Sequence, residues 1–175
     1  MLSPSTTGGR LGERREVEPL VATVEDARPL WFGSGLSTIR LDAAQTAGRL
    51  TVHEHVLPGG FQSPLHAHVE DDEVFYVLEG RLTAHLDGVD ERASTGDVIL
   101  FPRGVPHAFR VESPTARILA VNTPAGHERF FRALSVPATG RTLPPASQER
   151  PDPARLQAAA EEAGMRILGP PPWVE

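Results

Sequence analysis

The sequence predicts an all-β protein, a sandwich or barrel of short strands with short helices near its C-terminus. Between residues 20 and 137, short apolar runs are separated by Gly, Pro and Asp turn residues, which is the pattern of successive β-strands. Helical patterns appear only late in the chain. A chain of 175 residues can bury one hydrophobic core without disulfides, so we expect a single domain.

Three segments divide the chain. Residues 1–19 are polar and rich in Gly, Arg and Glu, so we expect a flexible N-terminal arm. Residues 20–136 carry the strand pattern and form the expected barrel. Residues 137–175 begin with a Pro-rich linker over 137–151, continue in a short helix, and end in an extended tail that we expect to pack on the barrel.

Eight strands are expected in this barrel. Their boundaries follow from apolar runs and from turn sequences such as Pro58-Gly59-Gly60, Asp87-Gly88 and Thr95-Gly96. The expected strands cover residues 37–41, 50–56, 63–68, 73–79, 81–86, 97–101, 107–111 and 117–122.

Two helices are expected after the strands. The first covers residues 127–134, where apolar side chains form a compact patch. The second begins at Asp152, a residue type that caps helix N-termini, with Pro153 in the first helical position, and it stops at Gly164. Residues 167–172 then close the chain in extended form.

Composition excludes several classes of function. A net charge of −6 argues against a nucleic-acid partner, which needs a basic surface. All 17 basic residues are Arg, and the absence of Lys excludes Schiff-base chemistry. The absence of Cys excludes disulfides and thiolate metal sites. The chain shows no signal-peptide pattern and no apolar run that could span a membrane, so we expect a cytoplasmic protein without a membrane partner.

Three histidines and a glutamate at fixed spacing are the candidate metal ligands. The pattern is His66-x-His68-x4-Glu73, and His107 follows after 33 further residues. Imidazole and carboxylate groups bind divalent transition metals, and this set offers three nitrogens and one oxygen. Side chains alternate between the two faces of a strand, so His66 and His68 point the same way, and a turn over 69–72 returns Glu73 beside them.

Asp72 is the competing carboxylate, because it precedes Glu73 by one position. We prefer Glu73 because its same-face neighbours, Phe75 and Val77, are apolar and are expected to face inward. Asp72 instead belongs to the acidic turn of residues 70–72, which we expect to be solvated.

Glycines and prolines around these residues extend the pattern. It reads Gly60-x5-His66-x-His68-x4-Glu73-x6-Gly80, followed by Gly96-x5-Pro102-x-Gly104-x2-His107. In these two motifs the chain resembles the cupin superfamily, whose fold is a jelly-roll β-barrel, here in a single copy. Over roughly residues 25–172, including the segment 122–131, the chain is similar to small bacterial monocupins related to quercetinase.

The resemblance implies a flavonol-type dioxygenase that uses O2. A metal bound by residues matching His66, His68, Glu73 and His107 would take the enol oxygen of the substrate, and Glu73 would double as the base for that hydroxyl. The second cupin motif usually ends in Asn, and Val111 stands there in this chain, which makes the inner wall more apolar. The resemblance also implies a homodimer.

A set of apolar side chains either lines an aromatic pocket or packs in the core. This set consists of Phe61, Phe75, Val77, Phe109 and Val111, with Phe130 and Phe131 as a candidate lid.

Four further histidines fall outside the motif. His53 and His55 alternate with Val and Glu residues, so either set of side chains can face inward, and a pocket role for His55 stays open. His85 and His127 are expected at the surface.

The first functional expectation is therefore a quercetinase-like dioxygenase that acts on an aromatic or enolic small molecule. One alternative is a metal-assisted isomerase or cyclase, in which the metal polarises a carbonyl or enolate. Another is a non-enzymatic metal cupin that binds a small molecule. Three nitrogens and one oxygen accept Fe, Mn, Co, Ni, Cu or Zn, so the sequence predicts one divalent transition metal ion without specifying the element.

Overall fold

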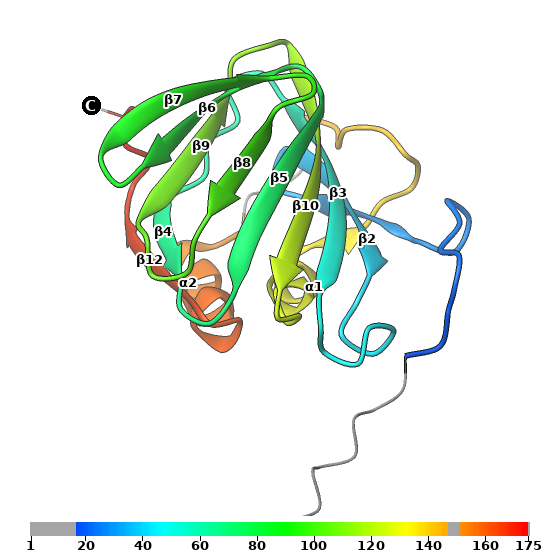
Figure 1. The fold of residues 1–175 in the computed structure, drawn as a ribbon. Coiled ribbons are helices and arrows are strands. Elements are labelled where there is room, and N and C mark those ends of the chain that lie inside the picture. The colour runs from blue at the N-terminus through cyan, green and yellow to red at the C-terminus, as the bar shows by residue number, and fades with distance from the viewer. Residues whose placement is uncertain (1–16, 147–150, 175) are drawn as a thin grey trace, which may run out of the picture.

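Two antiparallel β-sheets face each other around the interior of the molecule (Figure 1). The first has the spatial order β11 (Val136–Pro137), β1 (Pro29–Phe32), β2 (Gly35–Leu41), β3 (Thr51–Pro58), β10 (Thr115–Thr123), β5 (Asp72–Glu79) and β8 (Val98–Phe101). The second has the order β12 (Met165–Gly169), β4 (Leu65–His68), β9 (His107–Val111), β6 (Arg81–Leu86) and β7 (Val89–Ser94). The predicted all-β jelly-roll class is confirmed.

The structure, a computed structural model, describes residues 17–146 and 151–174. Most of the predicted N-terminal arm, residues 1–19, therefore lies outside the described residues, as do positions 147–150 of the predicted Pro-rich linker.

The hydrophobic core lies between the inner faces of the two sheets. On β3 every second side chain is buried, from Thr51 through His53 and His55 to Leu57. This period of two turns one face of the strand inward and leaves the other partly exposed. The largest apolar members of the core are Leu57, Phe75, Val77, Leu82, Ile99, Phe101, Val111 and Ile118.

Four strands of the structure were not among the eight predicted ones. Strand β7 is polar and largely exposed, so it has no apolar alternation to mark it. It pairs with β6 across the two-residue turn Asp87-Gly88, in which both residues have positive φ (47° and 89°). That turn type joins adjacent hairpin strands. The others are the short strands β1 and β11 and the C-terminal strand β12, whose edge pairing depends on the folded sheet.

Two helices, α1 (Glu128–Leu134) and α2 (Pro153–Glu162), pack together at one end of the barrel (Figure 1). The predicted cap of the second helix is confirmed, because the Asp152 carboxylate accepts hydrogen bonds from the amides of Ala154 and Arg155. In residues 17–146 and 151–174, no helix combines the length and the apolar character that a membrane crossing requires.

A buried glutamate joins α1 to the first sheet. The Glu128 carboxylate accepts hydrogen bonds from the Thr51 hydroxyl at 2.7 Å and from the Gly126 amide at 3.0 Å. The residue is only 3% exposed. Because Thr51 lies on the inner face of β3, this contact fixes the start of α1 against the barrel, and the two phenylalanines of that helix face the interior.

Candidate metal centre and cavity

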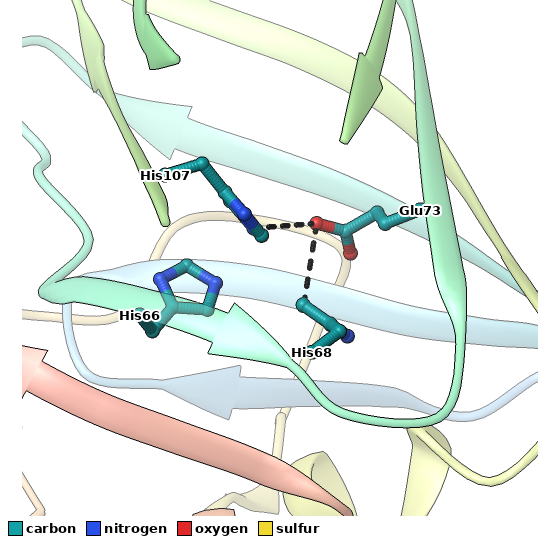
Figure 2. Close-up of side chains that lie close together, drawn as sticks. All are labelled: His66, His68, Glu73 and His107. Carbon is teal, nitrogen blue, oxygen red and sulfur yellow. Dashed lines mark ion pairs between the residues drawn. The ribbon is translucent and has the colours of Figure 1, made fainter. Parts of the chain in front are cut away.

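The four predicted ligands come from three strands and meet inside the barrel (Figure 2). His66 and His68 lie on β4, and Glu73 lies near the start of β5. His107 begins β9, where it is directly paired with His66 across the strands. All four side chains are buried, and each offers a ligand atom within 4.8 Å of those of the others.

The glutamate carboxylate faces two of the imidazoles. Glu73 Oε2 lies 3.7 Å from His68 Nε2 and 3.9 Å from His107 Nε2, as the dashed lines of Figure 2 mark. These separations are longer than hydrogen bonds and leave room between the atoms. Four donor atoms at such separations can surround one cation.

Hydrogen bonds set the tautomer of each histidine. His66 Nδ1 contacts the Pro64 carbonyl and His107 Nδ1 contacts the Val105 carbonyl, both at 2.8 Å. Because a carbonyl oxygen only accepts, each Nδ1 carries the hydrogen, and Nε2 keeps its lone pair. His68 Nδ1 donates in the same way to the Asp71 carboxylate at 2.9 Å.

The Nε2 atoms of His68 and His107 are buried and have no hydrogen-bond partner among the described residues. A buried polar atom without a partner is costly in a folded protein, by about 1–3 kcal/mol. A divalent cation would accept both lone pairs, and a carboxylate beside them would offset its charge. The donor set therefore fits a metal ion.

Burial governs the protonation of these groups. It lowers the pKa of His107 to about 4 and that of His66 well below its ordinary value, so both imidazoles are neutral at neutral pH. For His68 burial alone would lower the pKa, but the nearby carboxylates of Glu73 and Asp71 raise it above the ordinary value. Burial raises the pKa of Glu73.

Two residues that the sequence analysis did not identify support this centre. Asp71 is 5% exposed, so our expectation of a solvated acidic turn was wrong for this residue. Its carboxylate accepts hydrogen bonds from His68 and from the Asn122 side-chain amide, each at 2.9 Å. The same amide nitrogen lies 3.1 Å from Glu73 Oε1. Asn122 thus links both carboxylates, and partners of this kind hold metal ligands in orientation.

Asp72 faces away from the centre, as the sequence analysis expected. Its carboxylate accepts a hydrogen bond from the Arg103 guanidinium at 2.7 Å on the outside of the barrel. That pairing lowers the pKa of Asp72 to about 2. Glu73, one position later, is the carboxylate that turns inward.

A cavity of about 750 Å³ adjoins the cluster, and both His66 and Glu73 contribute to its wall. Of the predicted pocket residues, the following line it: Phe61, Phe75, Phe109, Phe130 and Phe131. Its other side is formed by the C-terminal region, with Leu156, Met165 and Ile167. The wall is therefore mostly apolar and aromatic, which suits a flat organic ligand.

Two predicted pocket residues do not line this cavity. Val77 and Val111 are 0% and 3% exposed and lie in the hydrophobic core. They share the inward face with Phe75 and Phe109, but neighbouring core side chains such as Leu82 fill the interior around them. Phe130 and Phe131, the candidate lid, are buried and line the cavity.

The register of β3 decides which way two of the remaining histidines face. His53 and His55 both face inward, and His55 lines the cavity. The expectation that His127 lies at the surface was wrong, because it is 6% exposed and also lines the cavity. The sequence offered a weak signal for this position: His127 stands three and four positions before the two phenylalanines of α1, a spacing that places side chains on one face of a helix.

Comparisons with known proteins agree with this geometry. The cupin domain family matches residues 52–122, which include all four clustered residues. The chain is 34% identical over 126 residues to quercetin 2,3-dioxygenase of Bacillus subtilis. The aligned region covers 72% of this chain and 37% of that protein. The chain spans half or less of the length of the curated relatives that it matches.

Solved structures show the same fold. A predicted oxalate decarboxylase from Thermotoga maritima matches with a TM-score of 0.54 and 22% identity, over 60% of this chain and 99% of that one. The polyketide cyclase RemF from Streptomyces resistomycificus matches with a TM-score of 0.50 and 26% identity, over 62% of this chain and 80% of that one. The chain belongs to the cupin superfamily and resembles its quercetinase-like members.

Proposed function

We propose that the protein is a metal-dependent dioxygenase of the quercetinase type that acts on an aromatic or enolic small molecule. One observation carries the proposal. Three imidazole nitrogens and a carboxylate converge at the wall of an aromatic cavity, in a chain that is 34% identical to a quercetin 2,3-dioxygenase over 126 residues. The cavity would hold the ring system of the substrate, and the cluster would meet its oxygen atoms.

The proposed metal site consists of His66, His68, Glu73 and His107. When bound, a divalent metal supplies a Lewis acid for the enol oxygen of the substrate and brings it together with O2. The Nδ1 atoms of the three imidazoles are engaged by Pro64, Val105 and Asp71, which leaves each Nε2 as the atom that would bind the metal. Fe, Mn, Co, Ni, Cu and Zn all remain candidates for this donor set.

Glu73 is the proposed base. Its Oε1 is held by Asn122 at 3.1 Å, while Oε2 faces the histidines and the side chain borders the cavity. A carboxylate in this place can accept the proton of a substrate hydroxyl that binds beside it. Beside this carboxylate the cavity wall is apolar and includes Phe75 and Phe109, whose ring centroids lie 5.1 Å apart.

Oxygen uptake tests the proposal. Metal-loaded protein and flavonols are mixed in an oxygen electrode, and we expect consumption of O2 that depends on the metal and on an enolic hydroxyl. Glu73→Gln should lower the rate by about 10²–10⁴-fold if the carboxylate is the base. Asp72→Asn is the matched control, because that carboxylate pairs with Arg103 outside the barrel, and it should keep the full rate.

A second candidate function is metal-assisted cyclisation or isomerisation. It is favoured by the likeness to the polyketide cyclase RemF, at 26% identity and a TM-score of 0.50. Turnover at an undiminished rate without oxygen would favour this reaction over the dioxygenase. Ligand-induced stabilisation without any product on mass spectrometry would instead indicate a binding protein. The homodimer stays a prediction, which size-exclusion chromatography with light scattering can test.

A further inference from the structure

Three buried imidazoles outside the proposed metal site form a continuous group. His53 and His55 stack on β3, with ring centroids 5.6 Å apart and an interplanar angle of 15°. His127, just before α1, lies 5.9 Å from His53. Phe131 packs against His53 and His55 with centroid distances of 4.9 Å each. Two members of this group, His55 and His127, line the cavity.

Polar atoms of this group are left without partners in the described part of the chain. Both ring nitrogens of His53 and Nδ1 of His127 are buried and make no hydrogen bond. The Ser37 hydroxyl, on β2 directly opposite His55, is also buried and unpaired. Buried polar groups in native proteins are nearly always satisfied by protein, water or ligand. Of His53, His127 and Ser37, only His127 lines the cavity, so its unpaired Nδ1 indicates that a polar group binds at this wall.

The chemistry of the imidazoles defines that polar group. Burial lowers the pKa of His55 to about 4, so its ring is neutral at neutral pH. A neutral imidazole offers one N–H donor and one nitrogen acceptor. A hydroxyl group matches both, whereas a carboxylate only accepts and loses its hydration on burial. The ring of Phe131 next to these histidines offers an aromatic surface for the ring that carries the hydroxyl.

We propose that His55 and His127 form a polar subsite of the cavity, which binds a phenolic hydroxyl of the ligand. This inference rests on the proposed function, in which the enol oxygen of the ligand binds at the metal site. It adds a second point of recognition, at another oxygen of the same ligand. The substrate is accordingly an aromatic molecule with at least two hydroxyl groups. One is the enol beside Glu73, and the other is a phenol between the two histidines.

Replacing His55 or His127 leaves few polar groups of the fold without a hydrogen-bond partner. Neither ring forms a hydrogen bond with another described residue, and His127 precedes α1 without capping it through its side chain. His127→Phe keeps a ring against Phe130, which stacks on it at 5.7 Å. His55→Phe removes the donor and acceptor, and His55→Asn restores both on a smaller side chain.

The test compares two probes on metal-free protein. 2-Naphthol carries a phenolic hydroxyl, and 2-methylnaphthalene has nearly the same shape without one. Their dissociation constants are measured by calorimetry or by displacement of a fluorescent dye. Wild type should prefer 2-naphthol by about tenfold, which is the contribution of a well-placed hydrogen bond. His55→Phe and His127→Phe should each reduce this preference to about threefold or less, and His55→Asn should retain part of it.

Phe61→Leu is the control, because Phe61 lines the same cavity and, among the aromatic rings of the described residues, contacts only Phe109. It should weaken both probes alike and keep the preference. An unchanged preference in both His→Phe variants, or no preference in wild type, would overturn the subsite. Failure of the proposed function is a separate result, because it appears as absent oxygen uptake in the metal-loaded protein while the naphthol preference persists.

Discussion

Replacing Asp71 by Asn tests how the surroundings of the metal site act on its ligands. In the structure one carboxylate oxygen of Asp71 accepts hydrogen bonds from both His68 and Asn122, each at 2.9 Å. An asparagine oxygen can accept the same two bonds, so the geometry is retained and the negative charge is lost. The substitution therefore isolates the effect of charge on the imidazole of His68.

The expected loss of metal affinity follows from the strength of these hydrogen bonds. A hydrogen bond to a charged acceptor contributes about 1.5–3 kcal/mol and a neutral one about 0.5–1.5 kcal/mol. The difference of about 1–1.5 kcal/mol corresponds to roughly tenfold in affinity. This agrees with the general cost of altering groups that orient metal ligands, about 10–100-fold. We expect Asp71→Asn to weaken metal binding about tenfold.

Competition with a chromophoric chelator measures this affinity, with Zn²⁺ as the probe ion. Thermal unfolding of the metal-free variant shows whether the fold is retained. Asp72→Asn is the matched control, since it removes the neighbouring carboxylate, which pairs with Arg103 at the surface. The reasoning is refuted if Asp71→Asn binds Zn²⁺ as tightly as Asp72→Asn does.

Two further predictions concern stability. As the pH falls from 6.5 toward 4, the unfolded chain gains a proton at His55 that the folded protein does not accept, because burial lowers the pKa of His55 to about 4. The free energy of unfolding of metal-free protein should fall by up to about 3 kcal/mol from this group, and urea unfolding of His55→Leu should show a correspondingly weaker pH dependence. Glu128→Ala leaves the Thr51 hydroxyl and the Ala43 amide without their acceptor, while the Gly126 amide keeps its contact with Thr51 Oγ1 at 3.2 Å. It should cost about 2–4 kcal/mol in denaturant unfolding, and a loss below 1 kcal/mol would contradict the role of this contact.

The sequence was sufficient to predict the residues that gather in the cluster. Alternation along a strand places His66 and His68 on one face, and the apolar neighbours of Glu73 show that it turns inward. Cross-strand pairing, which brings His107 opposite His66, is a property of the folded sheet. The two-motif spacing, through the resemblance to cupins, predicted His107 as a ligand but not this pairing.

The sequence was not sufficient for the groups around the cluster. Asp71 lies between two other acidic residues, and only the folded turn shows that its carboxylate points inward toward His68 and Asn122. His127 has no apolar alternation around it, and its burial depends on how α1 packs against β3. The contacts of Asp71 with Asn122 and of His127 with β3 join residues far apart in the chain, so local sequence patterns give little sign of them.

The metal content of reconstituted protein tests the central claim most directly. After incubation with a divalent transition metal and removal of the excess by desalting, elemental analysis gives the number of ions per chain. We predict one ion per chain for wild type and for Asp72→Asn, and none for His66→Ala and His107→Ala. A wild-type protein that retains no ion, or alanine variants that retain as much as wild type, would contradict the claim that these residues form a metal centre.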